Sequence, residues 1–261
     1  FINGSYGSAP LMTAEERKRV AEIVHREVDG RLPIITHVGE ASTRATIELA
    51  RHAADLGSAA VAVVVPYYYS GANAYGDDQI IRHYADVAES VGVPTFIYNN
   101  PKTCGYSLTP ELLAKLVNVG VLGMKDSSGS FTLLGEFNQA ATRVNQAFTC
   151  MSGSVGLLQP AYNIGIRGCV AGTASAFPEL AVALFAALEE RDWEKSNRLQ
   201  NLVIAERKIQ AAGGFRPAGS YTFLRMKGID CGTVRRPWSE PTDQTARYMR
   251  EEAAKLGLLK Q

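Results

Sequence analysis

Short apolar runs alternate with amphipathic segments along nearly the whole chain. Residues 60–66 form the clearest run, and their β-branched side chains leave no polar face, which predicts a strand buried on both sides as in a parallel sheet. Between such runs, apolar residues follow capping signals such as Thr13 and the Thr109–Pro110 pair, which are typical of helix starts. The pattern therefore predicts repeated strand–helix units.

Seven strands are predicted, and consecutive strand ends are about 20 to 35 residues apart, the spacing that βα units with right-handed crossovers require. Their ends lie near Gly4, Val38, Pro66, Asn100, Lys125, Met151 and Thr173. Helices are predicted over about 14–28, 42–56, 77–91, from 110 onward, and over 131–143, 155–164, 178–189, 193–212 and 242–256.

Two architectures share this order of elements, a doubly wound open sheet and a closed eight-stranded barrel. No G-x-G-x-x-G turn follows a strand, which counts against a dinucleotide-binding sheet. Residues 1–4 resemble the tail of a strand without an initiator methionine before it, so we expect a first βα unit of about 40 residues upstream. The expected fold is α/β, a (β/α)8 TIM barrel in one domain over 1–261, with the barrel at about 1–190 and additional helices at 191–261.

Composition narrows the class of protein. Hydrophobic residues at 46% and charged residues at 20% are ordinary for a soluble globular protein, and a net charge of +1 gives no reason to expect a nucleic-acid or membrane partner. No apolar run reaches the roughly 18 residues of a membrane span, and no signal peptide opens the chain. The four cysteines form no C-x-x-C pair, so we expect neither zinc nor disulfides, and a cytoplasmic location.

Lys125 ends the apolar strand that begins at Val119, and a polar turn follows it directly. Burial of an ammonium group lowers its pKa, and a neutral amine can condense with a ketone to form a Schiff base. The alternative is that Lys125 only marks the point where the strand meets solvent and pairs with a carboxylate such as that of Asp126.

Other polar side chains fall at the same ends of the predicted strands, where the chemistry of a parallel barrel is located. Tyrosine hydroxyls can relay protons, and backbone N–H groups in a glycine-containing turn can bind a carboxylate. Each tyrosine alone could equally be an amphipathic side chain at a strand end. The residues concerned are Ser5, Tyr6, Tyr67, Tyr68, Tyr69, Tyr98, Ser152 and Gly153.

Histidines are the remaining candidates for chemistry. His37 ends a predicted strand and is expected to be a hydrogen-bonded core residue, with a pocket-facing position as the alternative. His25, His52 and His83 lie on predicted helices and are expected at the surface.

Three motifs resemble those of one family, in the same order. Residues 4–7 read G-S-Y-G, residues 98–101 read Y-N-N-P, and residues 123–126 read G-M-K-D, which resemble the G-[ST]-x-G, Y-N-x-P and G-x-K-[DE] segments of the dihydrodipicolinate synthase/N-acetylneuraminate lyase family. These proteins are class I, pyruvate-type aldolases with a TIM barrel, usually homotetrameric and without metal or organic cofactor.

The resemblance also implies roles for individual residues. Lys125 would form the imine with a 2-keto acid, and Tyr98 would shuttle protons with Ser5. Ser5 and Tyr6 would bind the carboxylate, and Tyr68 would reach into the site of a neighbouring subunit. Gly153 and Val170 would complete the substrate pocket.

The chain departs from the family pattern at several positions. Ser8 stands where most members have glutamate, Tyr6 is bulkier than the usual threonine or serine, and Thr103 replaces the arginine with which the synthases grip their second substrate. Ser154 and Val155 replace the acidic pair of the sialic acid lyases. We therefore expect a Schiff-base-forming lyase, an aldolase or a dehydratase, acting on pyruvate or another 2-keto acid such as a keto-deoxy sugar acid. The alternatives are 4-hydroxy-tetrahydrodipicolinate synthesis from pyruvate and aspartate semialdehyde, and a non-catalytic keto-acid-binding barrel.

Overall fold

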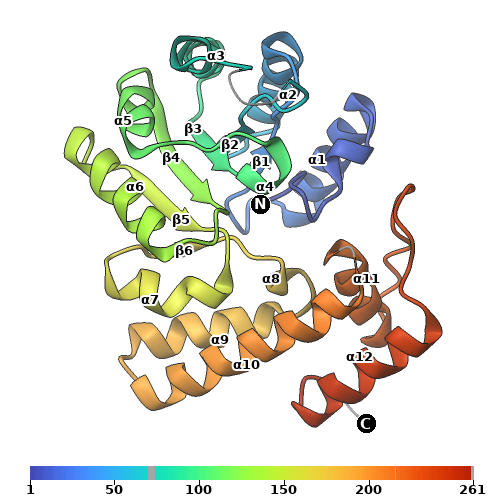
Figure 1. Cartoon of the computed structure of the whole chain (residues 1–261). Coiled ribbons are helices and arrows are strands. Elements are labelled where there is room, and N and C mark those ends of the chain that lie inside the picture. The colour runs from blue at the N-terminus through green and yellow to red at the C-terminus, as the bar shows by residue number, and fades with distance from the viewer. Residues whose placement is uncertain (70–73, 215, 260–261) are drawn as a thin grey trace.

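The computed structural model describes the 261-residue chain apart from residues 70–73, 215, 260 and 261. Six parallel strands form one sheet in the order β1-β2-β3-β4-β5-β6, and the isolated bridge between Ile2 and Thr36 lies beside β1. The sheet is surrounded by helices on its outer side (Figure 1). The strands are β1 (Ile35–His37), β2 (Ala60–Val64), β3 (Thr95–Asn99), β4 (Val121–Asp126), β5 (Thr149–Ser152) and β6 (Gly168–Cys169).

Helices connect the strands, and three more follow the strand–helix repeats. Thr13 caps α1 in a full capping box and Thr109 caps α5, as the sequence signals predict, and Ser42 and Ser130 cap α2 and α6 through their hydroxyl groups. The helices are η1 (Ala9–Leu11), α1 (Ala14–Val28), α2 (Thr43–Asp55), α3 (Asp77–Ser90), α4 (Pro101–Cys104), α5 (Pro110–Asn118), α6 (Phe131–Val144), η2 (Val155–Leu157), α7 (Leu158–Asn163), α8 (Thr173–Ala176), α9 (Pro178–Glu189), α10 (Trp193–Ala212), α11 (Arg216–Met226) and α12 (Asp243–Lys255).

This is an α/β TIM-barrel-like fold, and most elements lie where the sequence predicts them. Three predictions need correction. The last strand ends at Cys169 instead of Thr173, because Thr173 already begins α8. The first apolar stretch contributes only the bridge at Ile2. Helix α11 follows Gly213–Gly214, where no helix is predicted. An upstream βα unit that closes the barrel stays a prediction, as does the division at about residue 190.

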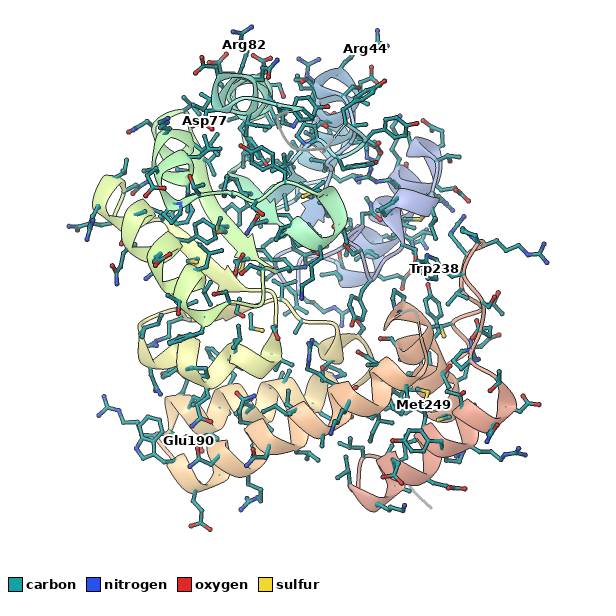
Figure 2. The ribbon with its side chains drawn as sticks, in the orientation of Figure 1. Arg44, Asp77, Arg82, Glu190, Trp238 and Met249 are labelled. Carbon is teal, nitrogen blue, oxygen red and sulfur yellow. The ribbon has the colours of Figure 1, made fainter. Side chains whose placement is uncertain are left out.

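Two hydrophobic clusters hold these layers together. The larger one joins the sheet to α2, α3, α5 and α6, and it includes Val61, Val63, Tyr84, Leu113 and Phe137, each with no exposed surface. The smaller one joins α9 to α10, α11 and α12 around Phe177, Leu184, Val203, Phe223 and Met249. The C-terminal helices therefore have a hydrophobic core of their own. Figures 1 and 2 show these helices along one side of the strand–helix units.

His83 is buried, which corrects the prediction of a surface residue. Its side chain is 4% exposed, its Nδ1 lies 2.9 Å from Thr43 Oγ1, and burial lowers its pKa to about 4. His83 follows Ile80 by three positions on α3 and so shares the face that packs against the core. Helical spacing was therefore the signal for its burial. His25 and His52 are partly exposed.

Candidate active site

Pairing between β3 and β4 puts Tyr98 and Lys125 at the same level of the sheet. Side chains at paired positions of parallel strands lie next to each other on one face. The Lys125 Nζ accordingly lies 4.1 Å from the centre of the Tyr98 ring and 4.2 Å from that of Phe1. Lys125 is 8% exposed, so these rings replace most of the water around its amine.

The buried position of Lys125 lowers the pKa of its amine to about 8. Asp126 is not its partner, because this carboxylate accepts hydrogen bonds from Asn99, at 2.7 Å, and from the hydroxyl of Ser128, also at 2.7 Å. Within the described ranges Lys125 has no ion pair with any carboxylate. The alternative of a solvent-facing lysine paired with Asp126 is therefore wrong.

Three polar side chains meet beside the lysine. The hydroxyls of Ser5 and Tyr98 lie 3.2 Å apart, and the Asn100 amide donates to both oxygens, at 3.3 Å to Ser5 and 3.1 Å to Tyr98. Burial raises the pKa of Tyr98, and hydrogen bonds from its neighbours offset this only in part. The phenol therefore keeps its proton at neutral pH and can pass it through the Ser5 hydroxyl.

The loop after Ile2 is anchored to the C-terminal helices through Tyr6. Its hydroxyl donates to Gln210 Oε1 on α10 at 3.1 Å, and Gln210 in turn donates to Ser220 on α11 at 2.8 Å. A Cβ at Gly172 would lie 2.0 Å from the Cζ of Tyr6, so only glycine leaves room for this ring. The glycine at position 172 thus accommodates the bulky Tyr6 of the G-[ST]-x-G loop.

A cavity of about 440 Å³ opens above Lys125. Six of the seven predicted site residues line it: Ser5, Tyr6, Tyr98, Lys125, Gly153 and Val170. Tyr68 does not. It is 79% exposed and packs edge-on against Tyr69, with ring centres 5.1 Å apart. Its predicted contribution to a neighbouring subunit stays a prediction.

Sequence reasoning gave no role to several residues that line this cavity. Asn100 lies within the Y-N-N-P motif, so its place two residues after Tyr98 was an available signal. Lys102 and Arg207 also line the cavity, as does Trp238, which is 45% exposed and labelled in Figure 2. Arg207 and Trp238 come from α10 and from the segment before α12, and not from the strand ends where site residues are predicted.

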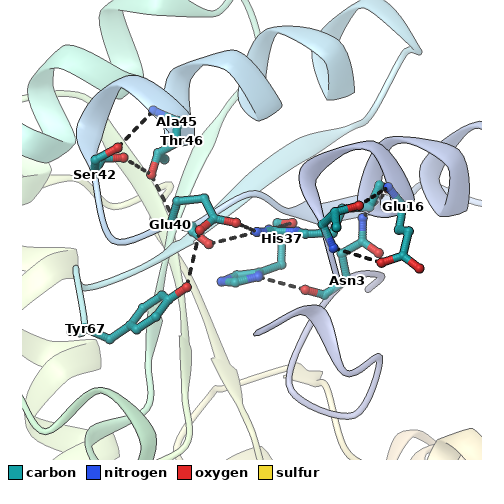
Figure 3. A network of polar contacts seen from close by, with 11 residues as sticks. Asn3, Glu16, His37, Glu40, Ser42, Ala45, Thr46 and Tyr67 are labelled. Carbon is teal, nitrogen blue, oxygen red and sulfur yellow. Dashed lines mark hydrogen bonds and ion pairs between the residues drawn. The ribbon is translucent and has the colours of Figure 1, made fainter. Parts of the chain in front are cut away.

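A second cavity of about 250 Å³ shares Tyr98 with the first, and Ser8, Arg17, His37 and Tyr67 also line it. The buried Arg17 guanidinium forms an ion pair with Glu40, whose carboxylate also accepts the Tyr67 hydroxyl at 3.3 Å (Figure 3).

His37 is the buried, hydrogen-bonded histidine expected. It is 5% exposed, and its Nδ1 lies 2.8 Å from the Asn3 carbonyl. Burial lowers its pKa to about 3. A carbonyl only accepts, so the neutral ring carries its proton on Nδ1.

In the part of the chain that the structure describes, no three side chains among His, Cys, Asp and Glu gather as metal ligands would. No helix in this part of the chain combines the length and apolar character needed to cross a membrane.

Comparison with known proteins agrees with this geometry. The dihydrodipicolinate synthetase family model matches residues 1–255. An uncharacterised DapA-like lyase of Halobacterium salinarum is 36% identical over 99% of this chain and 83% of its own length. A 4-hydroxy-tetrahydrodipicolinate synthase of Methanopyrus kandleri is 31% identical over 98% of this chain and 83% of its own.

Solved structures give the same result. YagE, a prophage protein of the dihydrodipicolinic acid synthase family from E. coli K12 solved in complex with pyruvate, superposes with a TM-score of 0.93 at 25% identity over 99% of this chain and 86% of YagE. The resemblance read from the three motifs is thereby confirmed. The chain belongs to the dihydrodipicolinate synthetase family and is a lyase of its Schiff-base, pyruvate-type class.

Proposed function

We propose that Lys125 forms an imine with the C2 carbonyl of a 2-keto acid. The neutral amine attacks the carbonyl carbon, the carbinolamine loses water, and the protonated imine then draws electrons from the bond between C3 and C4. As that bond breaks, the C4 hydroxyl gives up its proton, so that an aldehyde is released and the enamine of pyruvate is left. The enamine then takes up a proton at C3 before hydrolysis. Condensation is the same sequence in reverse.

The observation that carries this proposal is the placing of Lys125. Its amine is buried against two aromatic rings, has a pKa of about 8, and lies on the same cavity as the Ser5–Tyr98–Asn100 cluster. Carbinolamine formation and dehydration both require proton transfer at the former carbonyl oxygen, and a Tyr98 hydroxyl bonded to Ser5 can supply and recover that proton. The Ser5–Tyr6 loop would hold the keto acid's carboxylate through backbone N–H groups and the Ser5 hydroxyl.

A keto-deoxy sugar acid is the substrate class we propose. Thr103 lines the cavity, but its hydroxyl donates to the Asn100 carbonyl at 3.2 Å. Unlike arginine, it has no planar pair of donors that could bind a carboxylate. A cavity of about 440 Å³ is in the range that holds ligands well above the size of pyruvate. Serine, threonine and asparagine side chains around it could bind the hydroxyl groups of a sugar chain.

Trapping tests the proposal directly. Incubation with pyruvate and borohydride should add a stable mass to the peptide that contains Lys125, and Lys125→Ala should abolish it. Lys102→Ala is the matched control, since Lys102 lines the same cavity but is exposed and should leave the adduct in place. Absence of the adduct in folded wild-type protein would overturn the proposal.

Synthesis of 4-hydroxy-tetrahydrodipicolinate is the second candidate, favoured by the name of the Methanopyrus relative. It needs a substitute for the missing arginine, and the basic side chains of Lys102 and Arg207 on the cavity are the ones available. Coupling pyruvate to aspartate semialdehyde decides this candidate, and a background rate would remove it. Ligand-dependent thermal stabilisation without turnover across a panel of keto acids would instead favour the non-catalytic barrel.

We further propose that the chain forms the homotetramer expected from the family resemblance. The exposed Tyr68 and Tyr69 rings would then contact another subunit, and Tyr68 would complete the neighbouring site. Light scattering of the purified chain and of Tyr68→Phe, together with their activities, tests this assembly.

A further inference from the structure

The cavity above Lys125 is lined by basic side chains and by no acidic one. Lys102, Lys125 and Arg207 all contribute, whereas none of the described residues lining it is aspartate or glutamate. One anionic group, the carboxylate of the keto acid, accounts for only part of this positive charge. The excess concerns Lys102 and Arg207, which imine formation at Lys125 does not use.

Neither of these two side chains is neutralised by the protein. Among the described residues, Lys102 and Arg207 take part in no hydrogen bond or ion pair. Glu206 directly precedes Arg207 on α10. It is fully buried and bonded to Thr173 Oγ1 at 2.7 Å, and burial raises the pKa of its carboxyl group. The nearby Arg207 charge lowers the pKa of this carboxyl in part, but no ion pair joins these two described residues.

Both cations lie over the same side of the cavity. The Lys102 Nζ lies 3.8 Å from the Cβ position of Gly129, in the loop after β4, and the Arg207 Cδ lies 3.9 Å from that of Gly156, in the turn after β5. These two loops touch, because the Gly153 N–H donates to the Asp126 carbonyl at 2.6 Å. The cations therefore lie beside loops that follow neighbouring strands, and they line the same cavity as the Ser5–Tyr98 pair.

We infer that Arg207, assisted by Lys102, binds a second anionic group at the far end of the substrate, so that the preferred substrate is a dianionic 2-keto acid. A carboxylate and a phosphate share the chemistry that a guanidinium fork recognises. The inference rests on the proposed function for the first anionic group, the keto acid's carboxylate, which would bind at the Ser5–Tyr6 loop.

Binding of matched keto acids tests the inference without requiring turnover. 2-Oxoglutarate and 2-oxopentanoate have the same chain length and differ in a terminal carboxylate against a methyl group. Calorimetric titration of wild-type protein should give at least a tenfold tighter Kd for 2-oxoglutarate. Arg207→Gln should reduce that ratio to about two, while Lys208→Gln, which removes an exposed charge from the neighbouring position of α10, should leave it unchanged.

Acceptor specificity identifies the anion. Condensation of pyruvate with glyceraldehyde 3-phosphate, glyoxylate and glyceraldehyde compares a phosphate, a carboxylate and a neutral tail. A tenfold higher kcat/KM for either anionic acceptor that Arg207→Gln removes supports the inference and names the group. Equal kcat/KM values with the pyruvate adduct intact would overturn the inference and leave the proposed function standing.

The two proposals can fail separately. Loss of the borohydride adduct at Lys125 would overturn the proposed function, and the titration with the two five-carbon acids would still decide whether a second anion binds. Equal affinities for these acids, or a preference that persists in Arg207→Gln, would overturn the anion site whatever the outcome of trapping.

Discussion

The rate at which pyruvate forms an imine with Lys125 should depend on pH with a midpoint near 8. An ordinary lysine, with a pKa of about 10.4, has a neutral fraction at pH 7 of roughly one in 2,500. Burial against Tyr98 and Phe1 lowers the pKa of Lys125 to about 8, which raises that fraction to roughly one in ten. The structure thus accounts for an increase of about 250-fold in the fraction of neutral amine.

The pH profile follows from this single group. Below pH 7 the rate should fall about tenfold per pH unit, and above about pH 8.5 it should level off, because the amine is then mostly neutral. Two neighbouring side chains do not titrate in this range: burial raises the pKa of Tyr98 above its ordinary value, and the pKa of His37 is about 3. The ionisation state of pyruvate also does not change over this range.

Rapid-quench trapping measures the rate. Samples of enzyme and low pyruvate are quenched with borohydride at increasing times from pH 5.5 to 9.5, and the modified peptide is quantified by mass spectrometry. Lys125→Arg, which keeps a cation but no nucleophile at neutral pH, should give no adduct and serves as the blank. A rate that is flat between pH 6 and 8, or that still rises tenfold per unit above pH 9, would refute the link between burial and reactivity.

Three further variants test the site. Lys125→Met should raise the free energy of unfolding by about 3 kcal/mol at pH 7, as measured by urea denaturation. This gain should fade between pH 8 and 10.5, because in that range Lys125 of the wild-type protein is protonated in the unfolded state and neutral in the folded state. Tyr98→Phe should lower kcat by about 100-fold with little change in Tm, and unchanged kcat would exclude the proton role. Gly172→Ala should raise KM for the keto acid by about tenfold by displacing Tyr6, whereas Gly92→Ala, with open space around its Cβ position, should not.

The strands and most helices could be predicted from the sequence because their patterns are local. Residues 60–66 carry an uninterrupted β-branched run, and Thr13 carries a complete capping box. Helix α11 escaped prediction because Gly213–Gly214 and Pro217 signal a turn. Gly219 within this helix is required by packing, because a Cβ there would lie 2.4 Å from the Gln210 carbonyl oxygen. This requirement comes from a tertiary contact, which produces no periodic pattern in the sequence.

The active site divides in the same way. Lys125, Tyr98 and Ser5 were predictable because they sit at strand ends, and all parallel strands of a barrel present those ends to one mouth. Arg207 and Trp238 were not, because they reach the cavity from segments that follow the strand–helix repeats. Nothing local to either residue indicates which cavity it will face.

The hydrogen bond from Tyr6 to Gln210 joins residues 204 positions apart, and it has a consequence for biosynthesis. Chains emerge from the ribosome N-terminus first, so the loop that would bind the keto acid is made long before the helix that anchors it. A nascent chain that ends before α10 would carry Lys125 and Tyr98 but lack the support for Tyr6. Competence to bind substrate should therefore appear late in translation, when the segment around Gln210 leaves the exit tunnel.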